Sequence, residues 1–123
     1  MQKILIVEDD NILAKAFNIT LKDEGYETLV AVDGEDAIQK LKKFKPDLIL
    51  LDLIMPKKSG EDVLKEIKSD EKFKDIPVLI STVKSDTGSI SRCVALGIRG
   101  YFIKAHYTLE DIAKEVKKVF AQK

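Results

Sequence analysis

The sequence predicts a doubly wound α/β domain of three layers, with a parallel five-stranded sheet between two layers of helices. Five short apolar runs recur along the chain, and stretches with helical spacing of apolar residues alternate with them. Such alternation implies right-handed crossover connections and therefore parallel strands. A chain of 123 residues can bury one hydrophobic core but not two. We therefore expect a single (βα)5 domain over residues 1–123.

The five predicted strands show little alternation of apolar and polar residues, which is typical of strands covered on both faces. They span residues 3–7, 28–32, 47–51, 77–81 and 99–103. Pro46 and Pro77 stand at the entrances of the third and fourth strands, where no backbone N–H is needed inside the strand.

Five predicted helices follow these strands, each with apolar residues at helical spacing. The apolar positions are Leu13, Phe17 and Leu21; Ala37, Ile38, Leu41 and Phe44; Val63, Leu64 and Ile67; less regularly Ile90, Val94 and Leu96; and Leu109, Ile112, Ala113, Val116, Val119 and Phe120. Asp33 and Thr108 are expected to cap the second and fifth helices, Thr108 with Asp111 at capping-box spacing. Gly25 and Gly97 can adopt the left-handed conformation that ends a helix.

Composition and charge exclude several classes of function. Lys and Arg number 21, as do Asp and Glu, so no net field favours nucleic acid or an anionic membrane. No apolar stretch is long enough to span a bilayer or flanked like a signal peptide, and the single cysteine, Cys93, allows no internal disulfide. We expect a cytoplasmic protein without direct nucleic-acid or membrane binding.

Polar residues follow four of the predicted strands. They are Glu8, Asp9 and Asp10 after the first strand, Asp52 after the third, Thr82 after the fourth and Lys104 after the fifth. Ligands of open parallel sheets bind at the carboxyl ends of the strands. With the common strand order 2-1-3-4-5, Asp52 would lie beside Glu8 and Asp9. Strands are about 4.8 Å apart, so a short Thr82 suffices from the next strand and a long Lys104 from the one beyond.

Crowded carboxylates repel one another, and a hard divalent cation relieves that repulsion. Mg²⁺ prefers oxygen ligands in octahedral geometry, usually takes one or two carboxylates, and keeps positions for water and phosphate oxygens. With Mg²⁺ and Lys104 binding an incoming phosphoryl group, Asp52 could act as a nucleophile and form an aspartyl phosphate.

Each of these residues also has a simpler interpretation when it is considered alone. Asp9 and Asp10 would be acids favoured at a helix N-terminus, and Asp52 would begin a turn. Thr82 would be an ordinary strand residue, and Lys104 a solvated lysine. The prediction of phosphoryl chemistry therefore depends on the combination of residues.

Five segments resemble, in order and spacing, the receiver domain of two-component response regulators, including the single-domain chemotaxis type. They are KILIVEDDN, AVDGEDAI, PDLILLDLIMPKKSG, IPVLISTVKSD and GIRGYFIKAHYTLEDI, and together they cover essentially the whole chain. The resemblance implies the flavodoxin-like form of the predicted fold. It also implies a signalling phosphoacceptor that assists its own phosphorylation and dephosphorylation, not an enzyme acting on a separate substrate.

The resemblance also implies how Mg²⁺ is bound. Asp52 would be the phosphoacceptor and would bind Mg²⁺ directly, together with Asp9. The backbone carbonyl of Ile54 would be a third ligand, and Glu8 would act through water.

Thr82 and Lys104 would contact the phosphoryl group, and Tyr101 would be the switch aromatic that turns inward when Thr82 moves. Taken alone, Tyr101 would be half-buried packing. The phosphoryl donor would be a phosphohistidine on a sensor histidine kinase or a phosphotransfer protein. Phosphorylation would alter the surface of the fourth helix, fifth strand and fifth helix. The sequence leaves open the output partner, phosphorylation-dependent dimerisation, and whether the natural protein continues beyond Lys123.

Several positions depart from the family pattern. Ala105 replaces the usual cis-proline after Lys104; because a cis non-proline bond costs about 2.5–4 kcal/mol, we expect a trans bond. Val83 replaces a small residue, and Ile54 and Lys84 occupy positions that tune hydrolysis in this family, so we expect a long-lived phosphorylated form. These departures leave an alternative open: a degenerate receiver that acts as a phosphorylation-independent interaction module.

Three other classes of protein lack support in the sequence. A haloacid-dehalogenase-type phosphatase requires a second Asp where Ile54 stands. A flavodoxin-type carrier requires a phosphate-binding loop after the first strand, and a P-loop enzyme requires G-x-x-x-x-G-K; neither is present.

Overall fold

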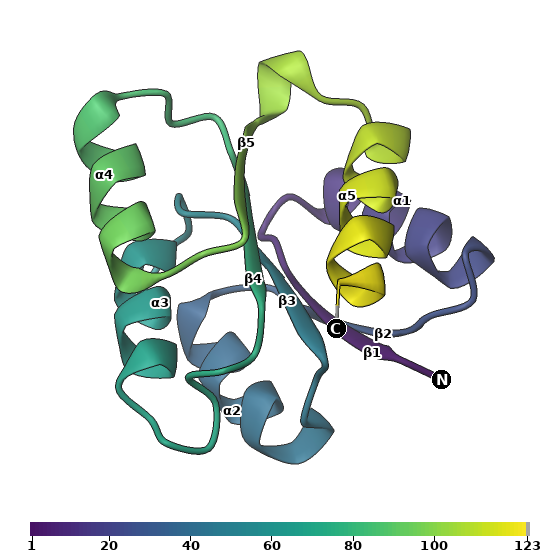
Figure 1. Ribbon diagram of the computed structural model, residues 1–123, viewed down its shortest axis with the longest axis horizontal. Coiled ribbons are helices and arrows are strands. Elements are labelled where there is room, and N and C mark those ends of the chain that lie inside the picture. Colours follow the sequence, from purple (N-terminus) through teal and green to yellow (C-terminus); the bar gives the residue numbers. More distant parts are fainter. Residues whose placement is uncertain (123) are drawn as a thin grey trace.

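Five parallel strands form one sheet in the order β2-β1-β3-β4-β5, which confirms the predicted fold class and strand order (Figure 1). The computed structural model describes residues 1–122. The strands are Lys3–Val7 (β1), Glu27–Ala31 (β2), Leu48–Leu51 (β3), Val78–Thr82 (β4) and Gly100–Ile103 (β5). The central strands β1, β3 and β4 are almost wholly buried, as expected for strands covered on both faces.

The five helices divide into two layers, one on each face of the sheet (Figure 1). They are Asn11–Asp23 (α1), Gly34–Phe44 (α2), Gly60–Lys68 (α3), Thr87–Leu96 (α4) and Leu109–Ala121 (α5), with a single 3₁₀ turn, Lys104–His106 (η1), before α5. Helices α2, α3 and α4 pack on one face of the sheet, and α1 and α5 pack on the other. In residues 1–122, no helix has the length and apolar character that crossing a membrane requires.

The predicted helix ends are confirmed. The Asp33 side chain caps α2, and Thr108 and Asp111 form a capping box at the start of α5. Gly25 and Gly97 have φ angles of 96° and 98° after α1 and α4, a region that glycine enters without steric cost.

The prediction that Val94 belongs to the buried apolar stripe of α4 is wrong, because Val94 is 60% exposed. Ser89 and Cys93 are instead fully buried, while Ile90 and Leu96 are half-buried. Ser89 and Cys93 lie one helical turn apart and so share a face. Because α4 packs through small side chains, the spacing of its large apolar residues does not show its buried face.

The capping box of α5 provides a test of local stability. Thr108 Oγ1 accepts a hydrogen bond from Asp111 N at 3.1 Å, and Asp111 Oδ2 accepts one from Thr108 N at 2.8 Å. We expect Thr108→Ala to lower the free energy of unfolding by about 1 kcal/mol in urea titrations, because it removes an N-cap. Thr87→Ala is the control, since Thr87 is exposed and α4 is capped by Asp86. An equal loss in both variants would contradict this assignment.

The stabilisation provided by this capping box should depend on pH. The hydrogen bond from the Thr108 N–H is the main cause that holds the pKa of Asp111 below its ordinary value. The stabilisation is therefore present at neutral pH and decreases as the pH falls through the lowered pKa of Asp111. The stability difference between wild type and Asp111→Ala, which lacks the carboxylate, should accordingly shrink in acid.

Candidate functional site

The sheet brings together carboxylates that are far apart in the sequence. Glu8 follows β1 and Asp52 follows β3; these strands pair in register, and Asp52 N donates to Val7 O at 3.0 Å. Glu8 and Asp52 are 2% and 5% exposed, whereas Asp9 is exposed. One carboxylate oxygen from each of Glu8, Asp9 and Asp52 lies within 4.8 Å of the others. The three acids that the sequence placed at one edge therefore form a cluster.

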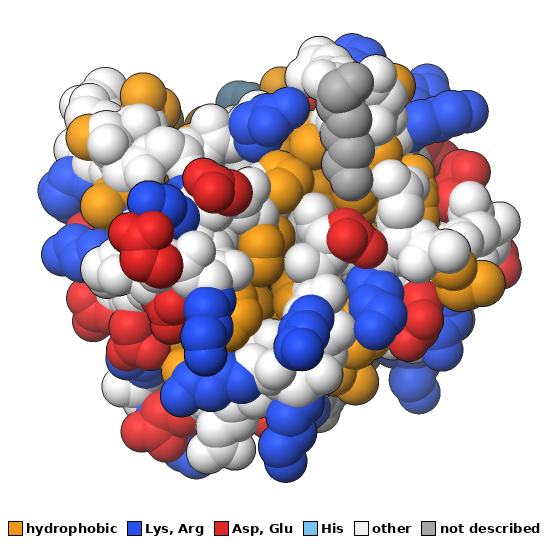
Figure 2. All heavy atoms as spheres, turned by 60° about the horizontal axis from the view of Figure 1, so that its bottom comes forward, with side chains coloured by type: hydrophobic (Ala, Val, Ile, Leu, Met, Phe, Trp, Pro, Cys, Tyr) orange, Lys and Arg blue, Asp and Glu red, His pale blue; other side chains and the backbone are white. Residues whose placement is uncertain are grey.

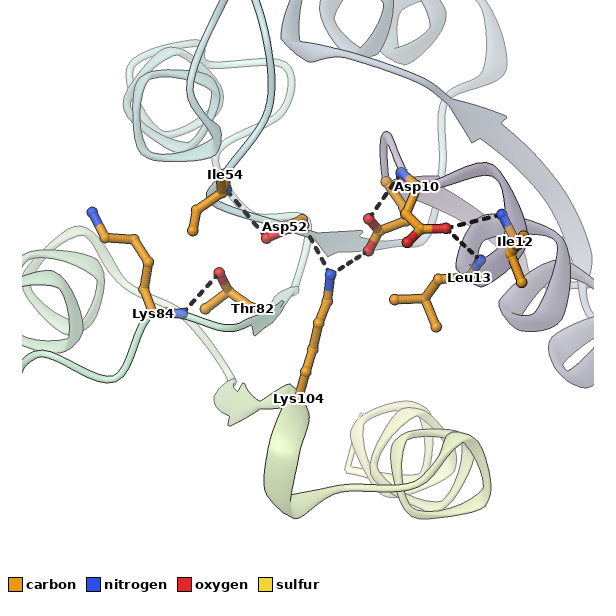
Figure 3. A network of polar contacts seen from close by, with 9 residues as sticks. Asp10, Ile12, Leu13, Asp52, Ile54, Thr82, Lys84 and Lys104 are labelled. Carbon is orange, nitrogen blue, oxygen red and sulfur yellow. Dashed lines mark hydrogen bonds and ion pairs between the residues drawn. The ribbon is translucent and has the colours of Figure 1, made fainter.

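Lys104 joins two members of this cluster (Figure 3). Its Nζ lies 2.8 Å from Glu8 Oε1 and 2.9 Å from Asp52 Oδ2. Lys104 begins η1, directly after β5, so its side chain crosses from a strand two places away from β3. A long side chain is needed for this reach, as the sequence predicted.

The charges of the cluster do not balance. Burial raises the pKa of Glu8, and the Asp52 charge adds to this, while the hydrogen bond from Lys104 only partly offsets them. For Lys104, burial would lower the pKa, but its hydrogen bonds to Glu8 and Asp52 outweigh burial and raise the pKa. Lys104 is thus held in its charged form. When all are ionised, three carboxylates against one ammonium group leave an excess of two negative charges.

This arrangement fits a hard divalent cation. The clustered donors are all carboxylate oxygens, and the described chain brings no histidine or thiol into the group. Mg²⁺ prefers such ligands and usually uses only one or two carboxylates, which leaves positions for water and phosphate. The cluster can thus hold a divalent cation close to the Asp52 carboxylate.

Two further predicted residues contact the same short backbone segment, and Figure 3 shows one of these contacts, between Thr82 and Lys84. Thr82 ends β4 and is fully buried, and its Oγ1 accepts a hydrogen bond from Lys84 N at 3.4 Å. Tyr101 on β5 is half-buried, and its hydroxyl donates to Lys84 O at 2.8 Å. Burial raises the pKa of Tyr101 to about 12, so the hydroxyl stays protonated as a donor. The sequence did not predict that Lys84 connects Thr82 and Tyr101.

Lys104 contacts Glu8 and Asp52 even though residues near it depart from the family pattern. The chain has no cis peptide bond among its described residues, which confirms the trans expectation for Lys104–Ala105. Ile54 N donates to Asp52 Oδ1 at 3.2 Å, while the Ile54 side chain is 49% exposed. Val83 is 62% exposed. Both apolar side chains are therefore largely exposed to solvent.

Asp10 has a structural role that differs from those of its two acidic neighbours. Its Oδ1 accepts hydrogen bonds from Ile12 N at 3.0 Å and Leu13 N at 3.1 Å, which caps α1. Its own N–H donates to Glu8 Oε2 at 3.2 Å. Asp10 thus caps the start of α1 and orients Glu8. The simpler interpretation, an acid at a helix N-terminus, therefore applies to Asp10 and not to the cluster of Glu8, Asp9 and Asp52.

Gly60 has a function that sequence reasoning missed. A glycine before a helix usually eases a turn, but the φ angle of Gly60 is not in the left-handed region. A Cβ at Gly60 would lie 1.9 Å from Asp52 O and 2.6 Å from Leu53 Cα, and Gly60 N donates to Leu53 O at 2.9 Å. Glycine is therefore required because the start of α3 touches the backbone of Asp52. The spacing of Asp52 and Gly60 was the only signal available in the sequence.

A hollow of about 610 Å³ on the described surface lies away from this cluster. It is lined mainly by residues after α2 and α3, among them Lys45, Lys72 and Phe73. These loops lie at the opposite end of the strands from Asp52, and Figure 2 turns that end forward, with Lys and Arg side chains around exposed apolar surface. The hollow is separate from the candidate site.

The comparisons with known proteins agree on one family. The family described as response regulator receiver domain matches residues 4–117. The DNA-binding response regulator MtrA of Mycobacterium tuberculosis is 34% identical over 113 residues, which cover 92% of this chain and 48% of MtrA. The chemotaxis protein CheY-3 of Vibrio cholerae is 34% identical over 119 residues, covering 96% of this chain and 91% of CheY-3.

A solved structure supports the same comparison. Chemotaxis protein CheY4 of Vibrio cholerae has a TM-score of 0.89 and 29% identity, covering 97% of this chain and 98% of that one. The present chain spans about half the length of the first curated relatives it matches, at 48–49%.

The close approach of Gly60 to Asp52 can be tested by adding one methyl group. We expect Gly60→Ala to lower the free energy of unfolding by about 1–3 kcal/mol, as overpacking against backbone does. It should also weaken Mg²⁺ binding, because Asp52 must move. Gly88→Ala is the matched control near the start of α4: its nearest neighbour would be the flexible Arg92 Nη1 at 3.2 Å. Urea denaturation measures the loss of stability and Mg²⁺ titration the loss of affinity. Equal losses in the two variants would contradict the assignment.

Proposed function

This chain belongs to the family of response-regulator receiver domains, and from that premise we propose that residues 1–123 form a phosphoacceptor domain of a two-component phosphorelay, with Asp52 as the acceptor. The observation that carries the proposal is the clustering of Glu8, Asp9 and Asp52 with Lys104, which lies 2.9 Å from Asp52. An excess of negative charge together with one ammonium group suits the binding of a metal and a phosphoryl group at the same place.

Asp9 and Asp52 would bind Mg²⁺ directly, with the backbone carbonyl of Ile54 as a third protein ligand and Glu8 acting through water. When bound, Mg²⁺ would supply charge neutralisation for the phosphoryl oxygens. Support comes from the donor set, which is made of carboxylate oxygens. The exposed position of Asp9 also leaves room for water ligands.

Asp52 would attack the phosphorus atom of a phosphohistidine on a sensor histidine kinase or phosphotransfer protein. A P–O bond to Asp52 forms as the P–N bond breaks, and the electron pair of that bond returns to the imidazole. Lys104 would turn from Glu8 and Asp52, which its ammonium group contacts, to orient the transferred group. Thr82 would bind a phosphoryl oxygen.

The same event would change the surface formed by α4, β5 and α5. When Thr82 turns toward the phosphoryl group, it would give up its contact with Lys84 N. Tyr101 holds the carbonyl of Lys84, so the loop before α4 and strand β5 would respond together. The output partner would bind this altered surface.

Phosphorylation of Asp52 has a direct test. Incubation with Mg²⁺ and acetyl phosphate should add one acid-stable, base-labile phosphoryl group to wild type and none to Asp52→Asn. Chelation of Mg²⁺ should abolish labelling. Asp10→Asn should be labelled normally, because asparagine also caps helices well. Absence of labelling in folded wild type would instead favour the degenerate receiver that acts as a phosphorylation-independent interaction module.

The lifetime of the phosphorylated form provides a second test. Ile54 cannot orient an attacking water molecule, and the exposed Val83 side chain stands beside the path of that water. We expect Ile54→Asn with Val83→Ala to shorten the lifetime about tenfold, equivalent to about 1.4 kcal/mol in the barrier. Val94→Ala on α4 is the control, since Val94 is equally exposed but distant in sequence from both positions. Unchanged decay of the radiolabel in the double variant would refute the explanation.

A further inference from the structure

A second cavity lies beside the carboxylate cluster, on the other side of Lys104. It measures about 220 Å³ and lies between α1, the start of α5 and the sheet. Its apolar walls are Leu13, Phe17, Leu109 and Ile112, and Tyr107 and Thr108 line it as well. Lys104 also lines it, and in Figure 3 the Leu13 side chain extends from α1 toward Lys104. One residue therefore borders both the cavity and the carboxylates.

Ser81 places a hydroxyl group in this apolar cavity. It lies on β4 opposite Phe102 of β5 and is only 4% exposed. No hydrogen bond of the Ser81 hydroxyl is found within residues 1–122, while every fully buried polar side-chain atom there has a partner. The Ser81 oxygen is therefore not sealed inside the protein but is reached from the cavity that Ser81 lines. The hydroxyl is therefore available to a molecule inside the cavity.

The dimensions of the cavity limit what can occupy it. A water molecule takes about 30 Å³ of liquid, and an apolar cavity of about 150 Å³ holds benzene. A cavity of about 220 Å³ accommodates a six-membered ring with one substituent. The apolar walls suit the ring, and Ser81 suits one hydrogen-bonding group.

The charges nearby exclude an ionic ligand. Among residues 1–122, Lys104 is the only cation that lines the cavity, and its ammonium group is already shared by Glu8 and Asp52. The excess of carboxylates would repel an anion. None of the described lining residues is a carboxylate that could compensate a cation. The bound molecule should therefore be neutral.

We propose that this cavity is a binding site for a small neutral molecule with an apolar ring and one hydroxyl group, which hydrogen-bonds Ser81. The ligand packs against the stem of Lys104 and holds it against Glu8 and Asp52. An incoming phosphoryl group requires that ammonium group, so occupancy slows phosphorylation of Asp52. This regulatory consequence rests on the proposed function; the binding site does not.

Phenol, toluene and benzoate can serve as probes in amide NMR titrations of the full chain. Phenol should shift amides of α1, α5 and β4 around the cavity in a saturable manner. Benzoate should bind about tenfold more weakly, because its charge is uncompensated. Saturable shifts confined to other parts of the chain, or equal binding of benzoate, would overturn the proposal.

Two substitutions at one position separate the hydroxyl group from the cavity. Ser81→Ala keeps the space, so it should bind toluene normally and phenol about fivefold more weakly, the loss expected for one hydrogen bond. Ser81→Val fills space and should lose both ligands, while its spectrum shows whether it is folded. Wild-type affinity for phenol in either variant would overturn the assignment of Ser81.

The regulatory consequence is measured by labelling with acetyl phosphate. Saturating phenol should slow labelling of wild type by a factor of about five, the lower end of typical coupling between sites, and should leave Ser81→Val unaffected. Normal labelling that phenol does not change would refute the coupling. If wild type is not labelled even without phenol, the proposed function fails, and the NMR titrations still decide the binding site.

Discussion

The ion pairs of Lys104 with Glu8 and Asp52 are the interaction on which the candidate site depends. Two buried carboxylates would otherwise face each other with little solvent to screen them, and Asp9 adds a third negative charge. Lys104 relieves only part of this repulsion. A site that is stable without metal but still has an excess of negative charge can bind a cation strongly and remain folded when the cation leaves.

Packing holds these charges in place. Strands β1 and β3 are buried between the helix layers and paired in register, so the residues that follow them must lie side by side. The start of α3 then presses on the Asp52 backbone, where Gly60 leaves no room for a Cβ. The position of the Asp52 backbone is therefore set by contacts on two sides. Side-chain rotation alone cannot move the carboxylate far, which would favour a reproducible geometry for the proposed phosphoryl transfer.

Lys104 and Lys84 connect this rigid centre to parts of the molecule that can move. Lys104 borders the carboxylates on one side and the Ser81 cavity on the other, although its peptide bond to Ala105 is trans. The Lys84 backbone contacts Thr82 and Tyr101, which lie on neighbouring strands. A change at Asp52 can thus reach α4 through Lys84 and α5 through the turn that carries Lys104. Lys104 is bonded to the Asp52 carboxylate directly, whereas Lys84 would sense a change there only through Thr82.

The sequence by itself determined the alternation of strands and helices and the helix ends at Asp33, Thr108, Gly25 and Gly97, because strand burial and capping are visible in short segments. The group of acids at one sheet edge followed once the strand order common to such sheets was assumed. Only the tertiary structure decided the buried face of α4, the contact of Gly60 with Asp52, the shared segment at Lys84 and the unpaired hydroxyl of Ser81. Each of these depends on which atoms from distant segments come within a few ångströms, and no spacing along one chain encodes that distance.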